Sequence, residues 1–121
     1  MKRPPETLDG SHVLYFADLT GVEPSGRTEH FVDDVRVGGF AGLAIARYDG
    51  SEYLLFYCNE DWTVINDAAF RSPWLCVAQA QWEYEQVEFE AVEPLPPDIP
   101  PSPTEFLFRA MTVNRRMTVG D

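Results

Sequence analysis

Two kinds of hydrophobic period lie side by side in the stretch from Tyr53 to Val87. Apolar residues run almost without interruption from Tyr53 to Cys58, and a second short run follows the acidic turn after it. From Ser72 onward the apolar residues recur at the spacing of an α-helix. A sheet with one helix laid across it requires both patterns, so this stretch predicts two strands and a helix around which the chain is organised.

The clearest local signal is Asp49-Gly50, a pair that suits the positive φ angles of a type I′ turn. It predicts a hairpin between Phe40–Tyr48 and Ser51–Asn59 with a two-residue loop, which would set Ile45 opposite Leu54. One face would then carry Leu43, Ile45, Leu54, Phe56 and Cys58. Because the other face is also apolar, we expect this hairpin in the middle of the sheet.

Other segments also have the composition of strands. His12–Leu19 is rich in β-forming residues, and Trp62–Asp67 follows the turn that contains Glu60 and Asp61. His30–Val37 alternates except at Asp33, which predicts a short or edge strand. Glu88–Glu93 alternates acids with apolar residues, as an edge strand or an extended exit from the sheet would.

Ser72-Pro73 predicts the start of the main helix, with the serine hydroxyl as the cap and proline at the first helical position. Two apolar stripes run along this helix, and we expect one of them to pack on the sheet. That stripe consists of Cys76, Val77, Ala80, Tyr84 and Val87. The second stripe must meet either the C-terminal segment or a partner, and it consists of Leu75, Ala78 and Trp82.

The last part of the chain begins with a proline-rich segment, Leu95–Pro103, which predicts a semi-rigid spacer. The sequence from Ser102 to Glu105 matches a capping box, and residues 104–114 fit a short helix or, alternatively, a strand.

The length of 121 residues is that of one domain. We therefore expect a single α+β domain with an antiparallel sheet of four to five strands, one main helix packed across a face and a short C-terminal helix. Its parts would be a loose N-terminal segment (1–11), the sheet and main helix (12–93), the spacer (94–103), and the C-terminal helix and tail (104–121).

The net charge of −11 belongs to one part of the chain. Between Tyr48 and Phe108 there are twelve acids and a single base, Arg71, whereas the rest is balanced. Phosphates would be repelled, which argues against nucleic acid and anionic membranes as partners and favours a basic protein. Acidity for solubility alone is the alternative. No apolar run reaches the ~18 to 20 residues of a membrane span, and no secretion signal is present, so we expect a cytoplasmic protein.

We find no catalytic motif, phosphate loop or metal-ligand cluster in the sequence, and nothing in it implies a cofactor. Cys58 and Cys76 have only His12 and His30 as candidate bases, and neither is close in sequence. We expect both thiols in the core between sheet and helix as small apolar side chains, and whether they form a disulfide stays open. The many carboxylates fit a solvated surface better than acid catalysis or a divalent-cation site.

Aromatic residues flanked by acids are better candidates for function. Trp62 at a turn and Trp82 on the second helical stripe are anchors of the kind enriched at protein interfaces, although packing in the core is the alternative for both. An acidic rim would surround them. The predicted partner-binding residues are Glu60, Asp61, Trp62, Trp82, Glu83 and Glu85.

One stretch also resembles a family. It has a strand that ends in Phe56-Tyr57-Cys58, an acidic turn before Trp62, then Asp67, and then Ser72 with a helix containing residues 79–84 (QAQWEY). This stretch is similar to a recurring type of small acidic bacterial protein. Such proteins are mostly uncharacterised, and some resemble immunity proteins that neutralise polymorphic toxins. The resemblance covers about a third of the chain and implies no functional residue.

Our leading hypothesis is a non-enzymatic acidic binding protein that masks a basic protein surface, such as that of a toxin, in the manner of an immunity protein or inhibitor. One rival is a structural or assembly subunit that forms a homo-oligomer through Leu75 and Trp82. The other is a small enzyme that uses surface carboxylates.

Overall fold

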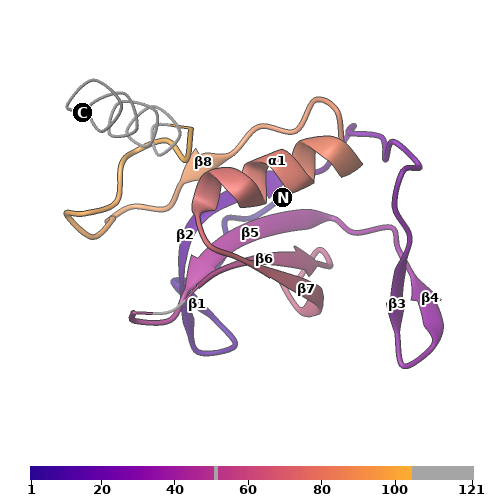
Figure 1. The fold of residues 1–121 in the computed structure, drawn as a ribbon, viewed down its shortest axis with the longest axis horizontal. Coiled ribbons are helices and arrows are strands. Elements are labelled where there is room, and N and C mark those ends of the chain that lie inside the picture. The colour runs from indigo at the N-terminus through magenta and orange to yellow at the C-terminus, as the bar shows by residue number, and fades with distance from the viewer. Residues whose placement is uncertain (51, 105–121) are drawn as a thin grey trace, which may run out of the picture.

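The computed structural model of this protein describes residues 1–50 and 52–104. Figure 1 shows a sheet with one helix lying across it and a separate small hairpin at one end. In chain order the elements are β1 (Thr7–Leu8), β2 (Ser11–Asp18), β3 (His30–Val32), β4 (Val35–Val37), β5 (Gly42–Arg47), β6 (Tyr53–Cys58), β7 (Val64–Phe70), α1 (Pro73–Glu83) and β8 (Glu90–Ala91).

The main sheet is antiparallel and has the strand order β1-β2-β5-β6-β7, with β8 also pairing with β2. Its two sides carry separate apolar clusters, because the central strands bury both faces. The cluster on the helix side includes Tyr15, Leu43, Ile45, Leu55 and Tyr57 together with Cys76, Val77 and Ala80 of α1. The cluster on the opposite side includes Val13, Phe16, Ala44, Phe56, Cys58 and Trp62. The predicted α+β class, an antiparallel sheet with the main helix across one face, is confirmed.

The central hairpin pairs one residue away from the predicted register. Ile45 lies opposite Leu55 rather than Leu54, and Leu43 lies opposite Tyr57. Arg47 lies opposite Tyr53 and not opposite Glu52, so the predicted two-residue turn at Asp49-Gly50 is wrong, as is the predicted face. Because both faces are apolar, a one-residue slip exposes no apolar side chain to water, and alternation alone does not choose the register.

Residues 30–37 form a two-stranded hairpin of their own, not the single strand that the alternation predicts. β3 and β4 pair from His30 opposite Val37 to Val32 opposite Val35. Asp33 and Asp34 form the turn with φ angles of 50° and 64°, which are the positive values of a type I′ turn. We call this hairpin the arm, and Figure 1 shows it standing clear of the main sheet.

Helix α1 begins at Pro73 as predicted, but its cap differs from the expectation. Ser72 has the extended backbone of a capping residue, yet its hydroxyl makes no cap bond, and its Oγ is buried without a hydrogen-bond partner in the described structure. Cys76 and Ala80 are fully buried against the sheet, which confirms the predicted face. On the second stripe Trp82 is 53% exposed.

The proline-rich segment packs on the domain instead of spacing it from the tail. The side chain of Ile99 is buried in the helix-side cluster, and the Tyr15 hydroxyl donates a hydrogen bond of 2.6 Å to the Pro100 carbonyl. The predicted C-terminal helix lies outside the described residues. Within the described part of the chain, no helix has the length and apolar character needed to cross a membrane.

Candidate functional site

Several segments that are distant in sequence meet at one end of the sheet. Asp18 lies opposite Gly42, and Gly42 lies opposite Cys58, so β2 ends, β5 begins and β6 ends at the same place. The arm enters β5 through residues 38–41, and the turn of residues 59–63 leaves β6 there. We call this the arm end of the sheet.

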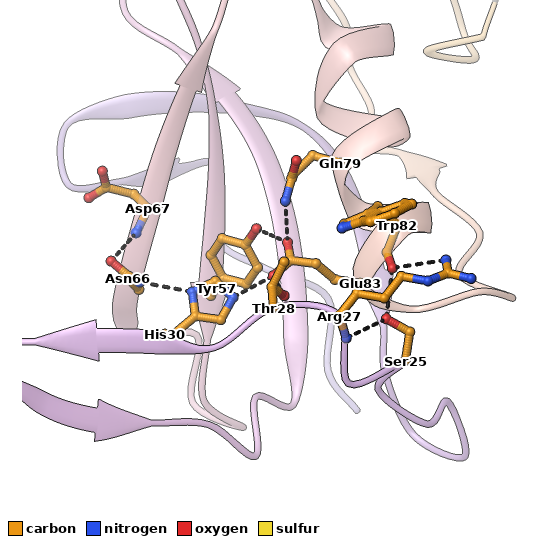
Figure 2. A network of polar contacts seen from close by, with 10 residues as sticks. All are labelled: Ser25, Arg27, Thr28, His30, Tyr57, Asn66, Asp67, Gln79, Trp82 and Glu83. Atoms are coloured by element: carbon orange, nitrogen blue, oxygen red, sulfur yellow. Dashed lines mark hydrogen bonds and ion pairs between the residues drawn. The ribbon is translucent and has the colours of Figure 1, made fainter.

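A buried carboxylate fastens the arm to the helix. Glu83, in the last turn of α1, is 3% exposed and accepts hydrogen bonds from four side chains (Figure 2). Thr28 Oγ1 and His30 Nε2 donate to its Oε1 at 2.6 and 2.5 Å. Its Oε2 accepts bonds from the Tyr57 hydroxyl and, at 3.2 Å, from Gln79 Nε2. One side chain therefore joins the loop before the arm, the arm, the sheet and the helix.

These contacts set the protonation of the network. Burial alone would raise the pKa of Glu83, but the hydrogen bonds from Thr28, Tyr57, His30 and Gln79 outweigh it and lower the pKa below its ordinary value. Burial and the bond to the Glu83 carboxylate both raise the pKa of Tyr57. Glu83 is thus held as an anion and Tyr57 as a neutral donor.

His30 is held at both ring nitrogens. Asn66 Oδ1 accepts the Asp67 N–H at 3.0 Å, so the Asn66 amide nitrogen faces His30 Nδ1 at 2.9 Å. Nδ1 is then the acceptor, and Nε2 carries the proton that it donates to Glu83. The ring also packs edge-on against Phe40, with centroids 5.1 Å apart. With both nitrogens engaged, His30 positions the arm and offers no free nitrogen for proton transfer.

The arm presents apolar and acidic side chains to solvent. Phe31 is 54% exposed and Val35 is 63% exposed, and the acidic turn Asp33-Asp34 lies at the tip. Neither Phe31 nor Val35 was among the predicted contact residues, although Asp33, which interrupts the alternation, was the available signal for a turn. Exposed apolar side chains rimmed by polar ones are a feature of interaction surfaces.

Trp82 and Glu85, two of the predicted partner-binding residues, lie together at this end and hold an arginine of the same chain. The Arg27 guanidinium stacks on the Trp82 ring at 4.5 Å from its centroid and pairs with Glu85 at 3.1 Å. Trp82 is exposed as an anchor should be, but one of its faces is already covered by Arg27.

The acidic turn after β6 is exposed as predicted, but two other predicted contact residues are not at the surface. Glu60 and Asp61 point to solvent and form no ion pair with another described residue. Trp62 is 5% exposed in the second cluster, and its Nε1 donates to the Lys2 carbonyl at 2.8 Å. The expectations that Trp62 is an exposed anchor and that Glu83 is a rim charge are therefore wrong.

The two cysteines lie on opposite faces of the sheet. Cys76 is in the helix-side cluster as predicted, whereas Cys58 is in the other cluster, so its predicted place between sheet and helix is wrong. Both thiols are free, and burial raises the pKa of each to about 12. At neutral pH neither is a thiolate nucleophile.

Within residues 1–50 and 52–104 there is no group of three or more His, Cys, Asp or Glu side chains placed to hold a metal ion. No family model matches the chain, and neither a curated protein nor a solved structure matches it.

Proposed function

We propose that this protein is a non-enzymatic, cytoplasmic binding protein that masks a basic surface of a partner protein, in the manner of an immunity protein or inhibitor. The observation that carries the proposal is the composition of the arm end. Exposed Phe31 and Val35 lie on the arm whose tip is Asp33-Asp34, and the acidic turn Glu60-Asp61 leaves the sheet at the same end.

The pairing of surface charges supports a basic partner. Arginines of the described residues are largely matched within the chain: Arg3 with Glu90, Arg27 with Glu85, Arg36 with Glu29, and Arg47 with Asp98. The acids of the arm tip and of the turn after β6 form no such pair with a described residue. Unpaired carboxylates on protruding segments attract a cationic protein from a distance and steer its approach.

The two rival hypotheses have less support. A homo-oligomer through the second helical stripe would have to use Trp82, which is already stacked by Arg27. Two copies would also bring together chains of net charge −11. An enzyme that used surface carboxylates would need one with an environment that raises its pKa. Glu83, the most buried carboxylate among the described residues, instead has a lowered pKa.

Affinity purification with paired variants tests the proposal. D33N/D34N removes both charges from the arm tip, and asparagine tolerates the positive φ angles there. The double variant D49N/E52Q removes the same amount of charge from the opposite end of the sheet. We expect the wild type and the opposite-end variant to retain the same basic protein, and the arm-tip variant to lose it. Retention by the arm-tip variant at the wild-type level, or a retained partner with an acidic surface, would contradict the proposal.

A further inference from the structure

A cavity lies between the arm, the loop before it and the end of α1. Its volume is about 550 Å³, which is enough for one long side chain and its backbone. The lining mixes apolar and polar groups. The residues that matter here are Val22, Glu29, Arg36, Phe40, Glu83 and Tyr84.

The accessible carboxylate of the cavity is Glu29, not Glu83. Both oxygens of Glu83 already accept two hydrogen bonds each, so it has no capacity left for a strong ligand bond. The Glu29 side chain is 55% exposed, and among the described residues its ion pair is to Arg36 Nη2 at 3.6 Å. Apolar walls from Val22, Phe40 and Tyr84 accompany it, which suits an aliphatic stem that carries a cation.

The Glu29–Arg36 pair is one that an incoming cation can exchange. Arg36 is 71% exposed, and its contact to the carboxylate is long for a charge-assisted bond. Pairs of this kind contribute little to stability, because water competes for both charges. Arg36 therefore pairs only weakly with the Glu29 carboxylate, and its position shows that a guanidinium can reach this carboxylate.

A neighbouring contact within the chain binds a guanidinium at a shorter distance. Arg27 stacks on Trp82 and pairs with Glu85, so a guanidinium on an aromatic ring beside a carboxylate already exists at this end of the molecule. The cavity offers the same elements, with Phe40 and Tyr84 as the rings and Glu29 as the carboxylate.

We propose that this cavity receives an arginine side chain of the basic partner, which displaces Arg36 from Glu29. The inference rests on the proposed function and names the anchor of that interaction. Glu60, Asp61 and the arm tip would steer the approach, and the inserted arginine would then hold the partner against the arm.

The first test needs no partner protein. N-acetyl-arginine amide is titrated into the wild-type chain and backbone amide shifts are followed by NMR, with N-acetyl-citrulline amide as the neutral analogue of nearly the same shape. We expect saturable shifts with the arginine derivative at Thr28, Gly38, Gly39 and Phe40, and none of that size with citrulline. Equal shifts with citrulline, shifts confined to Trp82 and Glu85, or no saturable shifts would overturn the proposal.

Two surface variants should change the affinity in opposite directions. Glu29→Gln should weaken arginine binding, and Arg36→Gln should strengthen it, each by about two- to fivefold. Glu52→Gln and Arg71→Gln make the same changes in net charge away from the cavity and serve as controls. If the controls shift the affinity as much as their counterparts, the effect is long-range attraction and the cavity is not the site.

The two proposals fail in different ways. If arginine saturates the cavity but arm-tip variants bind the partner normally, the arm end is not the masking surface. If arm-tip variants lose the partner while Glu29→Gln retains it fully, the masking function stands and the arginine anchor is wrong.

Discussion

At the scale of single residues, Glu83 and Trp62 show where sequence patterns mislead. Glu83 was expected in an acidic rim at the surface, but the helix ends there and the side chain turns into the network of Thr28, His30 and Tyr57. Trp62 follows an acidic turn, yet its ring fits against Gly42, where an added Cβ would lie 2.7 Å from Trp62 Cη2. Neither contact is local, so neither could be predicted from spacing.

Glu83→Gln should destabilise the fold by about 2 to 4 kcal/mol at pH 7, because an amide cannot accept all four donated hydrogen bonds. The folded-state pKa of Glu83 lies below its ordinary value of 4.5. Its contribution is therefore present above that pH and lost as pH falls through the lower folded-state pKa. Urea unfolding at a series of pH values should show the gap between wild type and variant closing in acid.

The control for this measurement is Glu85→Gln, which removes an exposed carboxylate paired with exposed Arg27. It should change stability by no more than about 0.5 kcal/mol. A gap for Glu83→Gln that stays constant from neutral to acidic pH would mean that the carboxylate charge is not what stabilises the network.

At the scale of elements, the hydrophobic pattern predicted the packing of an element with one buried face better than that of an element with two. The docking face of α1 was predicted correctly, because Cys76 and Ala80 share a 3.6-residue period and lie on the one stripe that is buried against the sheet. The register of the β5–β6 hairpin was not predicted correctly, because both strands are buried on both sides. The observed register brings Tyr57 to the helix side, where its hydroxyl reaches Glu83, and this contact is invisible in the local sequence.

The arm provides a prediction at this scale. Asp34 occupies the second position of its turn with φ of 64°, where glycine is the favoured residue. Asp34→Gly should stabilise the arm locally by up to about 1 kcal/mol, because glycine has no Cβ to clash at a positive φ. Hydrogen exchange should slow at the arm amides that pair β3 with β4 and stay unchanged in α1. Faster exchange in the arm would show that the carboxylate of Asp34, and not its backbone, determines the turn.

At the scale of the whole molecule, the topology gathers one end of the sheet into a surface that no single stretch of sequence contains. The predicted contact residues Glu60, Asp61 and Trp82 all lie toward this end, and their role in binding stays a prediction. The arm was not foreseen as part of it, since nothing in residues 30–37 reveals that His30 is tied to Glu83 and Asn66. The sequence therefore predicts where acidic residues gather on the molecule better than it predicts individual contacts.

The kinetics of binding should separate the roles of charge and apolar contact. E60K/D61K should slow association with a purified basic partner far more than it speeds dissociation, because exposed charges act over a Debye length of about 8 Å before contact. Phe31→Ala should mainly speed dissociation, since an apolar side chain contributes only after docking. Raising the salt concentration should slow wild-type association more than it slows association of E60K/D61K, in which the arm-tip acids still attract the partner. D49K combined with Glu52→Lys reverses the same charge at the far end of the sheet, so equal slowing by that variant would mean that overall charge, and not the arm end, guides the encounter.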